Sequence, residues 1–473
     1  MSIQPGQLLP SAGRLRALFR ETGYTVDGVD AALGPLATAA MGRGDPVPAL
    51  AAASGDDPLH VCIRLFLLGT DEPAPIAAFL PPPALEACGS GRVRAALDLR
   101  PHEDDWWLAA DIARRHPPAA DHVIGIGAAS TTLLAATLRQ DVASALDVGT
   151  GGGIQALHLL RHSRSVTATD ALPRAIDMAR LSFALSGLRP DAVELLCGDL
   201  LAPVSGRQFD LVVSNPPFVL APSGDDPLTY RDAAGADGGL ARLLRDAAAA
   251  LTSGGVAQVL TSWVIDASGD WQSRPAAMLP PGCDALVLLR EVLDPAEHVA
   301  LWRDDDEPEP QATARSLRWL AHVASLGADG IAYGLVVLRR TEAEPRIRLL
   351  DLRAEGGSPN GARIGGWLGR VSDVRDLSRA RLAVTADARL DEESGRGPDG
   401  WEVSSRRVVS AAALPETVGI DPITSALLAG CDGRLPLETV AELLAVASGV
   451  DPAQILRVAA HLYETGHLAF ASP

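Results

Sequence analysis

Residues 146–153 read "LDVGTGGG" and join an apolar run, "SALDV" (144–148), to a helix-like segment, "GIQALHLLRH" (153–162). Gly149, Gly151 and Gly153 stand at this junction. Glycine lets a chain turn sharply and lets a ligand lie against the backbone, and a helix N-terminus adds partial positive charge. The stretch therefore predicts a strand, a tight turn and a helix around a bound ligand.

The same pattern of apolar strand followed by helix continues from about residue 119 to 341. Further predicted strands are "SVTATD" (165–170), "VELLCGD" (193–199), "FDLVVSN" (209–215) and "VAQVLTSWV" (256–264). Apolar strands that alternate with helices indicate a parallel sheet covered on both faces. The sequence predicts an α/β fold for this region.

Two acidic residues follow the neighbouring predicted strands. Asp170 ends the second strand, 21 positions after Gly149, and could accept hydrogen bonds from ribose hydroxyls. Asp199 ends the third and could accept from an adenine amine, with Leu200 against the ring. Ligands bind at the carboxyl ends of such strands, so the set predicts a nucleoside site. A nicotinamide dinucleotide and S-adenosylmethionine (SAM) both fit, although the glycines lack the G-x-G-x-x-G spacing.

The fourth predicted strand ends in "SNPPFV" (214–219). Proline cannot donate to a sheet and stops a strand. The strand end therefore carries an amide (Asn215), two rigid rings (Pro216 and Pro217) and an aromatic side chain (Phe218). This could be a simple strand stop or a site that holds a flat group.

Through "LDVGTGGG", "TATD", "CGDL" and "FDLVVSNPPF" together, the sequence resembles the class I SAM-dependent methyltransferases. The N-P-P-F motif is similar to that of the branch that methylates planar nitrogens, which includes release-factor glutamine methyltransferases and adenine or guanine exocyclic-amine methyltransferases. The later segment 230–255 is similar to the one that follows this motif in the glutamine enzymes. The resemblance implies SAM as cofactor and a Rossmann-like core with a mostly parallel, seven-stranded sheet.

The resemblance also implies roles for individual residues. Asp147 would lie near the methionine ammonium group, or serve instead in a buried network. Segment 122–138 would fold over the cofactor, with Gly125, Gly127 and Thr131 as candidates for lining it. The implied cofactor-binding set is Asp147, Gly149, Gly151, Gly153, Asp170, Asp199, Leu200 and Asn215.

The chemistry of methyl transfer to nitrogen explains the Asn215–Phe218 tetrad. The lone pair of an amide or aromatic amine is delocalised and weakly nucleophilic. Two acceptors, the Asn215 side-chain oxygen and the Pro216 carbonyl, could draw the NH₂ group toward tetrahedral geometry. Pro216 and Pro217 would hold these acceptors rigidly, and Phe218 would stack on the planar group. We expect these four residues to be catalytic, with no metal ion.

Two regions flank this core. Residues 1–118 combine helical segments with a strand pair around "RPHEDD" (100–105), and residues 342–473 end in three helices and a strand. Both suggest winged-helix-like modules. "DEESGRGPDG" (391–400) indicates a turn or flexible loop. Trp106 and Trp107 could form a substrate shelf, although neighbours on a strand face opposite sides and one should be core.

The amino-acid composition limits the kinds of molecule that the chain is expected to bind. The formal charge of −18 opposes broad binding to phosphate backbones. Five cysteines without a C-x-x-C pair predict reduced, mostly buried thiols in a cytoplasmic protein. The sequence shows neither a signal-peptide design at its start nor a membrane-spanning apolar run. His102, His116 and His122 lack metal-ligand spacing on one element and are expected at the surface or in loops.

These observations favour an enzyme that methylates a planar nitrogen, with a protein or peptide amide as acceptor. An RNA or DNA base amine and a small molecule are the alternatives, and winged-helix-like modules often contact nucleic acid. A nucleic-acid-binding regulator built on a methyltransferase-like scaffold is the non-enzymatic alternative. Oligomeric state stays open.

Overall fold

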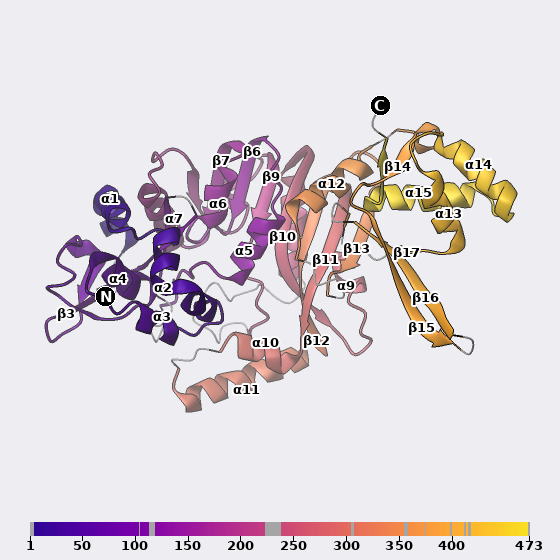
Figure 1. Cartoon of the computed structure of the whole chain (residues 1–473). Coiled ribbons are helices and arrows are strands. Elements are labelled where there is room, and N and C mark those ends of the chain that lie inside the picture. Colours follow the sequence, from indigo (N-terminus) through magenta and orange to yellow (C-terminus); the bar gives the residue numbers. More distant parts are fainter. Residues whose placement is uncertain are drawn as a thin grey trace.

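The chain forms a central sheet with one region at each side, as Figure 1 shows. The structure is a computed structural model, and it describes residues 4–103, 105–112, 119–222, 238–303, 307–353, 358–373, 375–397, 400–410, 413–414 and 418–471. No helix among these residues is long and apolar enough to cross a membrane. The described cysteines form no disulfide, and three of the five are buried.

The central sheet has eight strands in the order β13-β11-β12-β10-β9-β6-β7-β8. Its pairings are parallel except for the two made by β12, which is antiparallel to both β10 and β11. The strands are β6 (Val142–Val148), β7 (Ser163–Asp170), β8 (Glu194–Cys197), β9 (Phe209–Ser214), β10 (Leu251–Ile265), β11 (Cys283–Leu293), β12 (Gly330–Arg340) and β13 (Ile347–Asp351). The expected α/β, mostly parallel sheet is confirmed.

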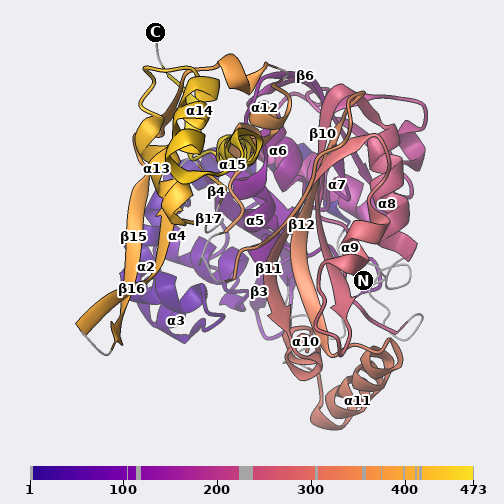
Figure 2. The same ribbon diagram turned by 90° about the vertical axis from the view of Figure 1, so that its right-hand side faces the viewer.

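Helices cover both faces of this sheet, because alternate strand residues are apolar on each side. Side chains of α5, α6, α7 and α12 pack on one face, and those of α8 and α9 pack on the other. Their bounds are α5 (Ala128–Ala136), α6 (Ile154–Leu159), α7 (Pro173–Leu185), α8 (Gly238–Ala249), α9 (Ser273–Met278) and α12 (Gly361–Val371). Helices α10 (Pro295–Leu301) and α11 (Glu309–Ser325) lie beside one end of the sheet (Figure 2).

The eighth strand corrects the expectation of seven. β13 pairs in parallel with β11, and the next helix, α12, buries Trp367 in the same core as α5 and α6. Both elements follow residue 341, where the sequence analysis placed a domain boundary. Apolar residues of segment 347–371 thus complete the central sheet rather than a separate C-terminal core.

The N-terminal region packs directly on the central one. It contains α1 (Ala12–Thr22), α2 (Val26–Met41), α3 (Val47–Ala52), α4 (Pro58–Cys62), a small sheet of β1 (Glu72–Pro73), β2 (Leu85–Ala87) and β3 (Arg92–Ala95), and the hairpin β4 (Asp98–His102) and β5 (Trp106–Ala110). The expected strand pair around 100–105 is this hairpin. Its apolar core includes Ala175, Met178, Leu181 and Leu185 of α7.

The C-terminal region has its own apolar core. It comprises β14 (Leu382–Val384), β15 (Arg389–Gly397), β16 (Gly400–Val409), β17 (Val418–Gly419), α13 (Pro422–Gly430), α14 (Leu437–Ser448), α15 (Pro452–Thr465) and β18 (Leu468–Phe470). The expected three helices and final strand are present.

The turn or loop expected at 391–400 is wrong for residues 391–397. They belong to β15, which pairs with β16 in a hairpin that projects from the body (Figures 1 and 2). Cross-strand ion pairs explain why so polar a segment forms strands. Glu392 lies 2.6 Å from Arg406, and Asp391 lies 3.6 Å from Arg407.

Candidate active site

The carboxyl ends of β6, β7 and β9 open on one cavity of about 460 Å³. The chain runs from β6 to β7 and β8 on one side of β6, and later returns to place β9 on the other side of β6. The ends of β6 and β9 therefore form a topological switch point, where ligands bind in such sheets. The residues expected from the sequence that line the cavity are Gly149, Gly151, Asp170, Asp199, Leu200, Asn215, Pro216, Pro217 and Phe218.

The glycine loop has the backbone conformation that its residues allow. Gly149, Gly151 and Gly153 have φ angles of +75°, +54° and +88°, in the left-handed region. Gly152 meets a different constraint, because a Cβ there would lie 2.8 Å from the Ala109 carbonyl oxygen. The loop is thus pressed against the N-terminal hairpin, and no side chain separates its backbone from β5.

Asp170 is held by backbone N–H groups at both carboxylate oxygens, one from the glycine loop and one from the turn before α7. Its Oδ2 accepts from the Gly151 N–H at 2.9 Å and its Oδ1 from the Leu172 N–H at 2.9 Å. Burial raises the pKa of this carboxyl, and these backbone donors act against that shift. Each oxygen keeps a further lone pair, so the carboxylate could still accept hydrogen bonds from a diol.

Asp199 and Leu200 form another wall of the cavity. The Asp199 side chain is exposed, and its Oδ2 lies 3.2 Å from an Arg242 guanidinium nitrogen on α8. Leu200 has a φ angle of +45°, which is rare for a residue with a side chain. Its carbonyl accepts from the Thr169 hydroxyl at 2.9 Å. This bond holds the strained turn that presents Leu200 to the cavity.

Asp147 and Gly153 are not brought into the cavity lining. Asp147 is 1% exposed, and its Oδ2 accepts from the Thr150 hydroxyl at 2.7 Å and from the Ala156 N–H at 3.1 Å. Burial raises the pKa of this carboxyl to about 7. Asp147 thus joins the loop to the first turn of α6, as in the buried-network alternative. Gly153 stands directly before α6, against Phe183.

The tetrad after β9 is held by its neighbours on β6 and β10. The Ser214 hydroxyl donates to the Val148 carbonyl at 2.9 Å, so the ends of β9 and β6 are fixed together. Ser262 on β10 donates to the Phe218 carbonyl at 2.5 Å. Ser262 also lines the cavity. These bonds fix the segment at both ends.

His298 and Tyr333 support the same segment from behind. His298 on α10 is fully buried, with its Nδ1 2.6 Å from the Tyr333 hydroxyl and its Nε2 3.4 Å from the Leu220 carbonyl. The Tyr333 ring meets the Phe218 ring edge to face, with centroids 6.2 Å apart. Burial lowers the pKa of His298 to about 4. Its neutral ring links α10 and β12 to the chain beyond Phe218.

Sequence reasoning missed these supports. Ser262 has a local signal, because "TS" interrupts the apolar run of β10. His298 has only the capping-box pattern "DPAEH", which indicates a helix start and no site. Its contact with Tyr333 spans 35 positions and depends on the fold.

The N-terminal region also contributes to the cavity. Asp98 and Arg100 on β4 line it, beside His122 from the loop that follows this region. Asp98 is 8% exposed and lies 2.8 Å from Arg100, while its Oδ1 meets no donor among the described residues. Burial raises the pKa of Asp98 despite the Arg100 guanidinium. Asp98 and Arg100 are two positions apart on β4, so the sequence indicates that their side chains share one face of the strand. It does not indicate what that face contacts.

Of the segment expected over the cofactor, Gly125 lines the cavity, while Gly127 and Thr131 do not. His122 lies in a loop, as expected, but is buried at the cavity wall rather than at the surface. His102 is half-buried at the end of β4, and His116 lies outside the described residues.

Trp107 is fully buried in the core, as expected for one of the two neighbouring tryptophans, Trp106 and Trp107. Neither tryptophan lines the cavity. The Trp106 ring lies under the Arg161 guanidinium, 4.3 Å from it, so a substrate shelf there is not supported.

Comparison with known proteins agrees with this geometry. Residues 126–267 match the family described as the methyltransferase small domain. The flanking residues 21–101 and 363–469 each match a family described as a domain of unknown function.

The relatives with matching segments are methyltransferases. A release factor glutamine methyltransferase of Deinococcus radiodurans is 47% identical over 123 residues, covering 23% of this chain and 42% of the relative. A ribosomal RNA small subunit methyltransferase C of Salmonella arizonae is 30% identical over 166 residues, covering 35% of this chain and 44% of the relative. The chain thus spans less than half the length of these curated relatives.

The matched segment, residues 126–267, contains the cavity-lining loop, Asp170, Asp199 and the Asn215–Phe218 tetrad. The match of residues 126–267 to the methyltransferase small domain confirms the resemblance to class I SAM-dependent methyltransferases expected from the motifs of the chain.

Proposed function

We propose that this protein is a SAM-dependent N-methyltransferase that acts on a planar NH₂ group, with the side-chain amide of a protein or peptide as its acceptor. One observation carries the proposal. The Asn215–Phe218 tetrad and the glycine loop after β6 line the same cavity, at the switch point of the sheet.

The residues present fit SAM. The cavity volume of about 460 Å³ is in the range of small-ligand sites. Gly149 and Gly151 would leave room for the methionine part, Asp170 would accept from the ribose hydroxyls, and Leu200 would lie against the adenine. Asp98, with one oxygen that meets no donor among the described residues, would suit an ammonium group. When bound, SAM supplies an electrophilic methyl group on a sulfonium sulfur.

The chain's part in the reaction is to hold and polarise the acceptor nitrogen. Asn215 Oδ1 and the Pro216 carbonyl would accept the two N–H hydrogens and localise the lone pair on nitrogen. The Phe218 ring is already fixed by Tyr333, and its carbonyl by Ser262. Such fixed acceptors need little rearrangement during the reaction. The nitrogen loses its proton readily once it is methylated, so a strong base is not required.

Two observations favour an amide acceptor over a nucleic-acid base. The glutamine methyltransferase relative shares 47% identity, against 30% for the ribosomal RNA methyltransferase relative. The chain's charge of −18 also opposes phosphate backbones. An exocyclic amine of RNA is the second candidate acceptor. It is favoured by the similarity to a ribosomal RNA methyltransferase, and the same tetrad could hold such an amine.

The test is transfer of labelled methyl from SAM into a lysate, with the product separated into protein, RNA, DNA and small-molecule fractions. Label in the protein fraction, recovered as methylated glutamine or asparagine after digestion, would support the proposal. Label in RNA that resists protease would establish the second candidate instead.

A control separates the enzyme from a binding scaffold. SAM binding is measured by calorimetry, and RNA and DNA binding at several salt concentrations. Tight nucleic-acid binding without any SAM signal would favour the regulator and overturn the enzyme. Asn215→Ala in the same lysate assay shows whether any label depends on the tetrad.

A further inference from the structure

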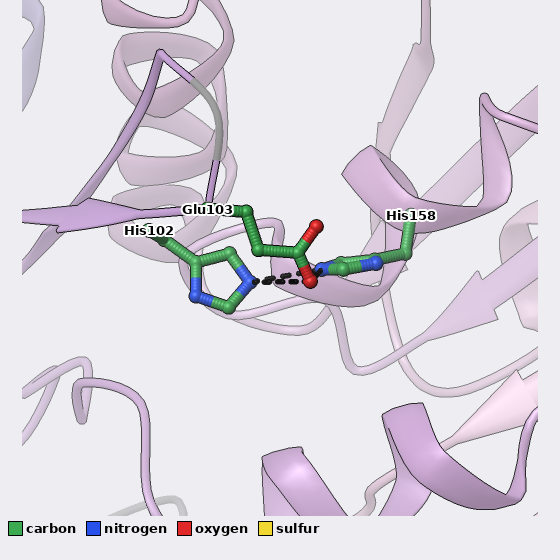
Figure 3. Close-up of side chains that lie close together, drawn as sticks. All are labelled: His102, Glu103 and His158. Atoms are coloured by element: carbon green, nitrogen blue, oxygen red, sulfur yellow. Dashed lines mark hydrogen bonds and ion pairs between the residues drawn. The ribbon is translucent and has the colours of Figure 1, made fainter. Parts of the chain in front are cut away.

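Three potential metal ligands from two regions of the chain meet outside the cavity. His102 ends β4, Glu103 follows it in the hairpin turn, and His158 lies on α6. Figure 3 shows the two imidazoles and the carboxylate turned toward one another. Their ligand atoms all lie within 4.8 Å of one another. His158 is 56 positions from His102, so no sequence spacing indicated this group.

The distances within this cluster suit a small cation. The two Nε2 atoms are 2.8 Å apart, and Glu103 Oε1 lies 3.5 Å from His158 Nε2 and 3.9 Å from His102 Nε2. A point equidistant from the three atoms lies about 2 Å from each, which is the length of zinc–nitrogen and zinc–oxygen bonds in proteins. A tetrahedral ion would need a shift of only a few tenths of an ångström.

The side chains around His102, Glu103 and His158 orient these three residues as possible metal ligands. His158 is 3% exposed, so its ring has little contact with water. Arg161 binds the other carboxylate oxygen, Oε2, at 2.7 Å and leaves Oε1 facing the imidazoles. Glu103 has a φ of +45°, a strained conformation that turns its side chain over the pair.

Two features oppose a cation. Arg161 and Arg139 are close enough to lower the pKa of His158, so they would repel a metal ion as well. A single proton shared by the two Nε2 atoms would also account for their 2.8 Å separation. The carboxylate of Glu103, which pairs with Arg161, offsets part of the repulsion.

We propose that His102, Glu103 and His158 form a binding site for one divalent ion of the zinc class, with water as the fourth ligand. Imidazole and carboxylate suit zinc, and the side chain of Glu103, 40% exposed, leaves the site open to water. The ion joins the N-terminal hairpin to α6, which begins directly after the glycine loop. Its role is to fasten the N-terminal region to the cofactor-binding loop.

The test uses the full chain, stripped of metal with a chelator and dialysed. Zn²⁺ alone is titrated in by calorimetry, and Co²⁺ is added separately for its visible absorption. The variants are His102→Gln, His158→Gln and Glu103→Gln, each checked for folding by circular dichroism. His322→Gln, on α11, removes an imidazole elsewhere and is the matched control. Since Glu103 lies in an exposed turn, its variant keeps the test usable if a histidine variant fails to fold.

The expected result is one Zn²⁺ per chain in the wild type and in His322→Gln, with a tetrahedral Co²⁺ spectrum. Each cluster variant should bind Zn²⁺ at least about tenfold more weakly. Bound Zn²⁺ should also raise the unfolding temperature of the wild type and not that of His158→Gln. A folded wild type that takes up no Zn²⁺, or cluster variants that bind it as tightly as the control, would overturn the site.

Discussion

Ser262, in the middle of the sheet, donates its hydroxyl hydrogen to the carbonyl oxygen of Phe218, the last residue of the tetrad. Ser262 is 3% exposed, so the carbonyl that it satisfies has little access to water. This bond and the one between Ser214 and Val148 hold both ends of the tetrad. The proposed acceptor groups therefore depend on residues outside the Asn215–Phe218 tetrad.

Ser262→Ala should slow methyl transfer by about fivefold, because loss of one buried hydrogen bond costs about 1 kcal/mol and frees the carbonyl of Phe218 to move. SAM affinity should change little. The measurement is kcat with labelled SAM, beside the exposed control Ser268→Ala. Equal rates in the two variants would show that the bond does not position the tetrad.

Asn215→Ala removes one of the two proposed acceptors for the NH₂ hydrogens. Methyl transfer should fall by about 10²- to 10³-fold, as when a fixed polar group that stabilises a transition state is removed. Calorimetry should still show SAM binding, because Asn215 polarises the acceptor. Turnover near the wild-type rate would remove Asn215 from catalysis.

Asp170→Ala should weaken SAM binding by about 1.5–3 kcal/mol, the cost of losing hydrogen bonds to a charged group. The variant also frees the N–H groups of Gly151 and Leu172, so circular dichroism and thermal unfolding accompany the titration. Asp191→Ala, which removes an exposed aspartate that pairs with Arg189, is the matched control. An unchanged dissociation constant in a folded Asp170 variant would place the ribose elsewhere.

The buried Asp147 should make stability depend on pH. Its pKa is about 7 in the folded chain because of burial, well above the usual value of 3.8. The folded state therefore binds more protons than the unfolded state between these values, so stability falls as pH rises from about 4 to 7 and is then level. Asp147→Asn cannot ionise and should lack this fall.

The check is the unfolding temperature of both proteins across this range. The wild-type value minus the variant value should decrease toward pH 7 and stay constant above it. A constant difference throughout would mean that the pKa of Asp147 is the same in the folded and the unfolded chain.

The position of the C-terminal boundary can be tested by truncation. A chain ending at residue 376 keeps β13 and α12 and should fold and bind SAM. A chain ending at residue 341 removes β13 from β11 and Trp367 from the core, so it should aggregate or lose SAM binding. Equal SAM binding by both truncated chains would show that the eighth strand is dispensable.

The sequence predicted the parts of the site that rest on local rules. Glycines at a strand–helix turn, acids after strands and prolines after an amide each have a short-range physical reason, and the structure brings most of them to one cavity. Asp147, near the start of the glycine motif, instead turns inward to Thr150 and to the first turn of α6. Position within the motif did not distinguish these two directions.

The missed residues depend on long-range packing. His298 reaches Leu220 across 78 positions, and Asp98 reaches the cavity only because β5 packs on the glycine loop. Residues 391–397 show the opposite failure, because a glycine-containing polar segment pairs as a strand with β16, with cross-strand ion pairs such as that of Glu392 with Arg406. Local propensity contains no information on such partners.

The shared core of the N-terminal region and α7 has a consequence for synthesis of the chain. Residues 4–112 bury their apolar side chains partly against Met178, Leu181 and Leu185. This region therefore cannot complete its core when it leaves the ribosome. It must wait until α7, more than 60 residues later, has also emerged and turned back to meet it. Until then Phe19, Phe66 and Trp107 lack part of their cover, so the nascent chain exposes apolar surface throughout this interval.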